Sequence, residues 1–171
     1  VPFFLSVFFL NQLPPPSEED ITSRSKRTIM DGKGRMTFIK QFLTGMILLL
    51  VLYFFLTAYR DFRDNYMPEV FTAMGYPPEP TLFSKADYPI AFGIMIVMAL
   101  LNLAKNHRRG LLAVFAVMIA GMLLMGVATL LKDFGRISGL WWMILSGFGA
   151  YLAYVPFGAV LFERIMASTK A

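Results

Sequence analysis

The sequence predicts an all-α, polytopic helical membrane protein. Of its 171 residues, 57% are hydrophobic and only 16% are charged, whereas soluble domains are about 45–50% apolar and about 25% charged. The mean hydropathy is +0.59. The apolar residues gather in long runs that are apolar on every side, unlike the one-sided pattern of a soluble amphipathic helix. Because lipid satisfies no backbone polar group, such runs are expected to form a bundle of transmembrane helices.

The first apolar run, residues 1–13, is shorter than the roughly 20 residues that cross a bilayer. It starts at Val1 rather than at a methionine, and three prolines at 14–16 prevent the helix from continuing. We interpret it as the end of a truncated transmembrane helix. The alternative is the apolar core of a signal peptide, although a basic leader and a small-residue cleavage site are missing.

A polar segment with charges of both signs follows at residues 14–37, and it is expected to be a solvated linker. The rest of the chain, 38–171, is expected to contain four transmembrane helices. The predicted spans are residues 38–59, 88–104, 110–131 and 137–162.

The longest connection between the predicted spans is 60–87. Its first residues have helical character, and the prolines from Pro68 onward are expected to end that helix. Ser84 and Asp87 are spaced as a capping box at the start of the second span. Pro89 then fits the first helical turn.

The distribution of basic residues predicts the orientation in the membrane. Most of the 16 Lys and Arg residues fall on the side of the 14–37 linker if the spans alternate in direction. Basic residues concentrate on the cytoplasmic face of membrane proteins. We therefore expect the linker, the loop at 105–109 and the C-terminus to be cytoplasmic.

Composition argues against several classes of protein. The chain has no cysteine and a single histidine, His107, so neither disulfides nor the usual three or four ligands of a zinc site are expected. It contains no nucleophile motif, phosphate-binding loop or dinucleotide fingerprint. We expect no catalytic residue, no cofactor and no enzyme activity. The net charge of +5 resides in the connections, so the expected partner is the lipid bilayer and not nucleic acid.

A dense charged segment follows the first predicted span. On a helix Arg60 and Asp64 are neighbours, Arg60 and Arg63 share a face, and Asp61 points another way. One interpretation is a solvated helix end beyond the membrane. The other is a gate or a solute contact at the mouth of a cavity, since ionisable residues in a bilayer mark pathways.

Two further groups are candidates for function. Lys105, Arg108 and Arg109 form a tight basic loop that is either a topology signal or a conformational latch. Tyr151 and Tyr154 lie three residues apart, just before Pro156 in a segment rich in glycine. They either support close helix packing or line a polar cavity beside a helix that Pro156 bends.

Three motifs carry a resemblance to a known family: the segments 11–16 (NQLPPP), 59–65 (YRDFRDN) and 151–157 (YLAYVPF). Together they resemble an uncharacterised family of bacterial membrane proteins, which is similar to the major facilitator superfamily of secondary transporters. The resemblance implies a partial major-facilitator-like bundle. Residues 1–13 would end helix six, the linker would join the two halves, and the four spans would be helices seven to ten.

The resemblance also implies a function. The chain would be a fragment of a permease in the bacterial inner membrane that works by alternating access. It would need the missing helices of the full-length chain, and a small solute is a candidate partner. The alternative is a non-transporting membrane scaffold or subunit, which needs its charged ends only for orientation and docking.

Overall fold

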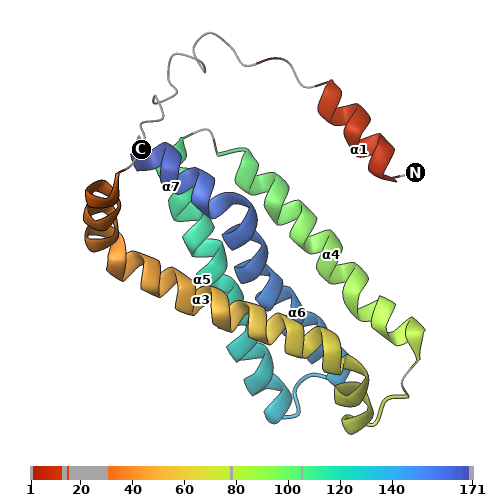
Figure 1. Ribbon diagram of the computed structural model, residues 1–171. Coiled ribbons are helices and arrows are strands. Elements are labelled where there is room, and N and C mark those ends of the chain that lie inside the picture. Colours follow the sequence, from red (N-terminus) through yellow and green to blue (C-terminus); the bar gives the residue numbers. More distant parts are fainter. Residues whose placement is uncertain (1, 13–14, 16–30, 78, 105, 170–171) are drawn as a thin grey trace. The chain divides into compact units, whose positions relative to one another are not determined.

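The computed structural model describes residues 2–12, 15, 31–77, 79–104 and 106–169, and most of these residues are helical. The chain divides into two compact units, Val1–Gln41 and Phe42–Ala171, and helix α3 passes from the first into the second. Figure 1 shows the labelled helices along the chain. In order, the elements are α1 (Pro2–Asn11), α3 (Gly32–Ala73), α4 (Pro80–Asn102), α5 (His107–Asp133), α6 (Gly139–Pro156), a π-helical turn η1 (Phe157–Leu161) and α7 (Phe162–Thr169).

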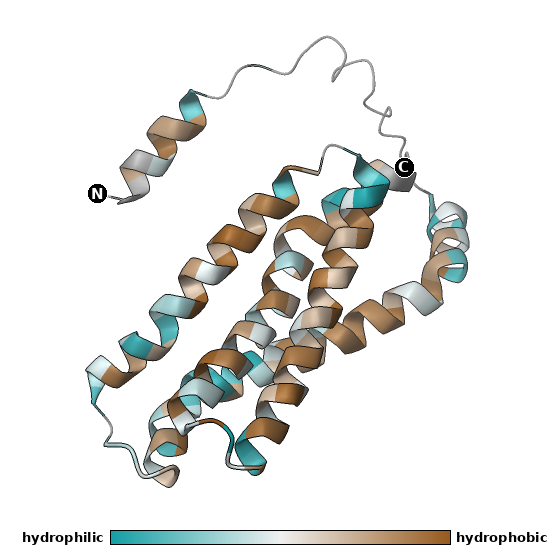
Figure 2. Cartoon of the chain, turned by 180° about the vertical axis from the view of Figure 1, so that it is seen from behind, coloured by the Kyte–Doolittle hydropathy of each residue, from teal (hydrophilic) through white to brown (hydrophobic). Residues whose placement is uncertain are grey.

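The predicted fold class is confirmed. Four helical stretches are long and apolar enough to cross a membrane, and no strand occurs in the part of the chain that the structure describes. Large apolar side chains stay exposed along them, such as Phe92 on α4 and Leu123 on α5. Figure 2 shows hydrophobic residues along the lengths of α4 and α5, with hydrophilic residues at helix ends. Patches of this kind suit contact with lipid or with other apolar helices.

Helix α3 is longer than the sequence predicts. It begins at Gly32, inside the segment expected to be a linker. It ends at Ala73, beyond the end of the predicted span at Tyr59 and beyond Pro68, where the helix was expected to stop. The side chain of Asp31 caps its start by accepting a 2.7 Å hydrogen bond from the backbone N–H of Gly34. The remainder of the predicted linker and Leu13 lie largely outside the described residues.

Pro68 lies inside α3, so the expectation that it ends the helix was wrong. Proline has no N–H group, and the carbonyl of Asp64, four residues earlier, therefore lacks its helical donor. Helices in membranes tolerate interior prolines when neighbouring groups compensate. The missing hydrogen bond falls in the charged segment that follows the first span.

Helix α4 begins at Pro80 instead of near Ser84. Pro80 occupies the first turn, where an N–H group would have no helical partner in any case. The hydroxyl of Ser84 donates to the carbonyl of Pro80 over 3.3 Å, so the predicted capping box with Asp87 was wrong. Pro89, expected in the first turn, lies well inside the helix.

Helices α5 and α6 share the most extensive contact of any described helix pair. They cross at two glycines. A Cβ atom on Gly121 would lie 2.4 Å from the carbonyl oxygen of Gly149, and one on Gly149 would lie 2.5 Å from the carbonyl oxygen of Gly121. Small residues permit this approach in membrane helices, and α5 and α6 therefore form the tightly packed pair of the second unit.

Pro156 ends α6, and the π-helical turn η1 follows directly. The sequence predicts that Pro156 distorts its helix, because a proline removes one backbone hydrogen bond. The structure accommodates the proline with this wider turn, and helical geometry resumes in α7. Turns of this type are rare and occur often at functional sites.

A buried arginine contacts the chain at the C-terminal end of α4. Arg164 on α7 is only 9% exposed. Its Nη1 donates to the carbonyl of Ala104 over 2.8 Å and its Nη2 to that of Leu101 over 3.3 Å. Ala104 lies just beyond α4, and the carbonyl of Leu101 also accepts from the backbone N–H of Ala104 over 3.4 Å. Arg164 therefore ties the C-terminal end of α4 and the residues after it to α7. Gly110 on α5 leaves room for it, since a Cβ there would lie 2.9 Å from Nη1.

Candidate functional site

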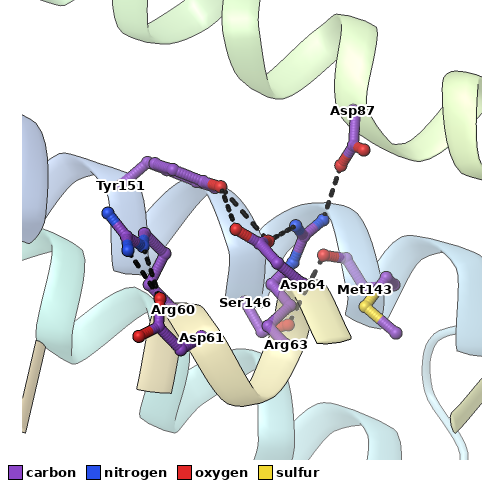
Figure 3. A network of polar contacts seen from close by, with 8 residues as sticks. All are labelled: Arg60, Asp61, Arg63, Asp64, Asp87, Met143, Ser146 and Tyr151. Atoms are coloured by element: carbon purple, nitrogen blue, oxygen red, sulfur yellow. Dashed lines mark hydrogen bonds and ion pairs between the residues drawn. The ribbon is translucent and has the colours of Figure 1, made fainter. Parts of the chain in front are cut away.

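A second buried arginine, Arg63, joins α3 to α4. Its side chain is only 4% exposed. Its Nη2 lies 2.9 Å from Oδ1 of Asp87 on α4, and its Nη1 lies 3.2 Å from Oδ1 of Asp64, the next residue on α3. The side chains of the two aspartates are 43% and 50% exposed. One buried guanidinium is thus shared by two accessible carboxylates, as Figure 3 shows.

Gly147 on α6 makes room for this arginine. A Cβ atom at position 147 would lie 2.7 Å from Nε of Arg63 and 2.7 Å from Cδ1 of Ile90. The guanidinium therefore packs against the bare backbone of α6. Its Nε has no hydrogen-bond partner among the described residues. Arg63 is held in place by its two ion pairs and by packing.

Tyr151 on α6 completes the group. Its hydroxyl donates to the carboxylate of Asp64, at 3.1 Å from Oδ2 and 3.2 Å from Oδ1. The Cζ atom of Arg63 lies 5.9 Å from the centroid of the tyrosine ring, within range of a cation–π attraction. Three helices therefore contribute to one set of polar side chains, Arg63, Asp64, Asp87 and Tyr151, which we call the Arg63 cluster.

Arg60 makes a separate set of contacts. The sequence places it beside Asp64 on the helix, but its ion pair is with Asp61, which was expected to point another way. Its Nη1 donates to the hydroxyl of Tyr154, and its Cζ lies 4.6 Å from that ring's centroid. Tyr53 stacks between Tyr154 and Phe157, with ring centroids 6.4 Å and 5.4 Å apart. These three stacked rings connect the Arg60–Asp61 ion pair to the π-helical turn η1.

The Arg63 cluster lies between two apolar clusters of the bundle. Along α3, Leu56 belongs to one apolar cluster and Met67 to the other. Along α6, Met143 and Ala153 belong to different clusters in the same way. By the 1.5 Å rise per residue, Arg63 is roughly 15 Å from the C-terminal end of α3. Arg63 therefore lies in a polar layer between the two apolar clusters, while its two carboxylate partners stay half exposed.

A cavity of about 330 Å³ adjoins this layer between α4 and α6. It is lined by Asp87, Ile90, Ala91 and Ile94 from α4 and by Tyr151 from α6. A larger groove of about 450 Å³ lies beside Tyr53 and Phe157, and its other lining residues are apolar or glycine. Of these two spaces, only the smaller one is lined by both a carboxylate and a hydroxyl.

The structure places the predicted site residues in different settings. Arg63, Asp64 and Tyr151 meet in one cluster, whereas Arg60, Asp61 and Tyr154 form the neighbouring group. Arg108 and Arg109 lie exposed in the first turn of α5, and Lys105 lies outside the described residues. The gating, lining and latch roles of these residues stay predictions.

Sequence reasoning missed three residues of functional interest. Asp87 was assigned to a helix cap, whereas no specific role was predicted for Gly147 or Arg164. A useful signal was available for Asp87. With residues 90, 91 and 94 it falls on one face of the helix, and it is the only acidic residue on that otherwise apolar stripe. Among the described residues, no group of three His, Asp or Glu side chains could hold a metal ion.

Comparison with known proteins identifies one family. The family model described as "Family of unknown function (DUF5690)" matches residues 1–171. No curated protein and no solved structure matches the chain. The match agrees with the expectation of an uncharacterised family, whereas the resemblance to the major facilitator superfamily stays a prediction.

Proposed function

We propose that this chain, which belongs to the family of unknown function matched above, is part of a secondary transporter that works by alternating access. The observation that supports the proposal most strongly is the Arg63 cluster. It shares one buried guanidinium between two accessible carboxylates, in a layer between apolar clusters and next to a cavity. Ionisable groups inside a membrane bundle are costly and generally mark a pathway.

The packing of the helices is also suited to movement. Helices α5 and α6 cross backbone to backbone at Gly121 and Gly149, which favours a rigid pair. Helix α3, in contrast, meets α4 and α6 through long side chains, including the ion pair of Arg63 with Asp87. Such side-chain contacts break and re-form at lower cost than close backbone packing. In a transporter of this type, helices rock around a central site without covalent chemistry.

Under this proposal Arg63 and Asp64 act in gating. The bond from Tyr151 to Asp64 connects α3 to α6, and the ion pair of Arg63 with Asp87 connects α3 to α4, in the state described here. Opening of the pathway would exchange these partners for water or solute. Tyr151 is then a lining residue of the cavity, while Arg60, Asp61 and Tyr154 support the neighbouring helix contact.

The proposal can be tested without knowledge of the solute. We would introduce Ala91→Cys, on the exposed wall of the cavity, into the protein as it occurs in its membrane. A membrane-impermeant maleimide is added to one side or the other of sealed, oriented vesicles. Modification of the peptide that carries position 91 is followed by mass spectrometry, so other cysteines do not interfere. Alternating access predicts labelling from both sides.

A matched control is Ala128→Cys on α5, because Ala128 is fully buried and should be labelled from neither side. Labelling of position 91 from one side only, with both sides of the vesicle shown to be accessible, would refute alternating access. That result would favour the alternative function, a membrane scaffold or subunit that does not transport. Two-sided labelling would contradict the scaffold.

A further inference from the structure

The cavity beside the Arg63 cluster combines three kinds of wall. Asp87, Ile90, Ala91 and Ile94 occupy positions i, i+3, i+4 and i+7, so they form a single face of α4. Tyr151 faces them from α6. The volume of about 330 Å³ falls in the range of roughly 300–1,000 Å³ that is typical of small-molecule sites. One wall is acidic, one is aromatic, and the others are aliphatic.

The acidic wall is only partly neutralised. Arg63 supplies one positive charge to the two carboxylates of Asp64 and Asp87, which leaves the Arg63 cluster with an excess of one negative charge. Oδ1 of Asp87 is bonded to Arg63, whereas Oδ2 has no hydrogen-bond partner among the described residues. Lys85 is two positions away on α4 and faces another side of that helix. Figure 3 shows Asp87 bonded to Arg63 through one carboxylate oxygen.

We infer that this cavity binds a small organic ammonium ion, with Oδ2 of Asp87 as its counter-ion. The inference rests on the transport function proposed above and names the class of solute that is carried. The free carboxylate oxygen attracts the positive charge. Tyr151 adds an aromatic wall to the cavity beside this carboxylate. Ile90, Ala91 and Ile94 contact the hydrocarbon part of the solute.

The wall chemistry favours an organic cation over a bare metal ion. A hard cation such as Ca²⁺ takes about six to eight oxygen ligands, and Mg²⁺ requires a near-octahedral set. Among the side chains that line this cavity, only Asp87 and Tyr151 carry oxygen atoms. The hydroxyl of Tyr151 is already bonded to Asp64. One charge contact, one aromatic wall and an aliphatic surface match an alkylammonium group much better.

The test uses choline as the probe and protection of Ala91→Cys as the readout. Choline at ten times its Kd should slow maleimide labelling of position 91 roughly tenfold, because only the unoccupied fraction reacts. The neutral isostere 3,3-dimethylbutan-1-ol has nearly the same shape and should not protect. Sodium chloride at the same ionic strength should not protect either. Equal protection by the alcohol, or by sodium, would overturn the inference.

Variants assign the effect to the carboxylate. Asp87→Asn, combined with Ala91→Cys, should abolish protection by choline, and Asp87→Glu should retain it. Asp133→Asn, an exposed aspartate at the end of α5, is the matched control and should leave protection unchanged. If Asp87→Asn does not fold, the comparison of choline with its neutral isostere still decides the question. Undiminished protection in a folded Asp87→Asn protein would overturn the inference.

The two proposals fail in different ways. Labelling of position 91 from both sides without protection by choline would refute the organic cation and leave alternating access standing. Protection by choline with labelling from one side only would refute transport, and the inference about a carried solute would fail with it. Labelling from both sides, with protection from both sides that requires Asp87, is the expected result.

Discussion

The crossing of α5 and α6 gives a prediction in which two chemically identical substitutions have opposite effects. Gly149→Ala adds one methyl group at a point where a Cβ would lie 2.5 Å from the carbonyl oxygen of Gly121 and 2.8 Å from Cγ of Met125. Gly126→Ala adds the same group on α5, where nothing beyond the neighbouring residues and backbone of its own helix lies within 4 Å of the new Cβ. Only the surroundings of the two glycines differ.

The magnitudes follow from helix propensity and from packing. Replacing glycine by alanine inside a helix stabilises it by up to about 1 kcal/mol, and Gly126→Ala should show this gain. At position 149 the new methyl meets a backbone oxygen, which cannot rotate away, so the helices must separate. Overpacking of this type costs about 1–3 kcal/mol. The Gly149→Ala protein should therefore be less stable than the parent, and the difference from the stabilised Gly126→Ala protein should be larger.

The assay is thermal unfolding of the purified protein in detergent, measured as the temperature at which the monodisperse folded fraction is lost. Gly121→Ala should resemble Gly149→Ala, because a Cβ there would lie 2.4 Å from the carbonyl oxygen of Gly149. The double substitution should cost less than the sum of the two, since the helices separate only once. A Gly149→Ala protein at least as stable as Gly126→Ala would refute the close crossing.

Three further predictions concern the charged residues. Arg164→Met should lower the free energy of unfolding by about 1–3 kcal/mol, because the carbonyl of Ala104 loses its donor and that of Leu101 loses one of two. An unchanged unfolding midpoint would contradict this role of Arg164. Arg63→Gln should destabilise the protein, because it leaves the half-exposed carboxylate of Asp87 without its positive partner. Adding Asp87→Asn should restore about 1 kcal/mol, because the second substitution removes that unpaired charge. A double variant less stable than Arg63→Gln would refute that coupling. An impermeant thiol reagent added to intact cells should label Thr81→Cys and spare His107→Cys, and the reverse pattern would invert the predicted topology.

The positions of the helices were largely predictable, but their ends were not. The apolar runs predicted all four spans because a membrane helix must be apolar along its whole length. Helix α3, however, continues beyond Tyr59 through a charged segment to Ala73. Hydropathy ends a predicted span at the first charges, whereas a helix continues wherever its backbone bonds can form. Pro68 misled the prediction for a related reason, because one missing hydrogen bond does not end a long helix in a packed bundle.

The candidate site was predictable only in part. The charged segment around Arg63 and the tyrosine at 151 stood out in the sequence, because charges and hydroxyls are rare beside apolar runs. Their partners did not stand out. Asp87 has the spacing of a helix cap, and Gly147 is one of several glycines in a segment where small residues are common. Sequence spacing within α3 also suggested Asp64 as the neighbour of Arg60, while the ion pair forms with Asp61.

The sequence by itself determined an all-α chain with four helices long and apolar enough to span a membrane, because the length and the continuity of an apolar run are local properties. Only the tertiary structure decided that Arg63 is buried, that it is shared by Asp64 and Asp87, and that Gly147 leaves space for it. Asp87 is 24 residues from Arg63 along the chain, and Gly147 lies on a different helix. Contacts of this kind depend on how α3, α4 and α6 pack together, since packing determines which polar groups lose water and which partners they must find.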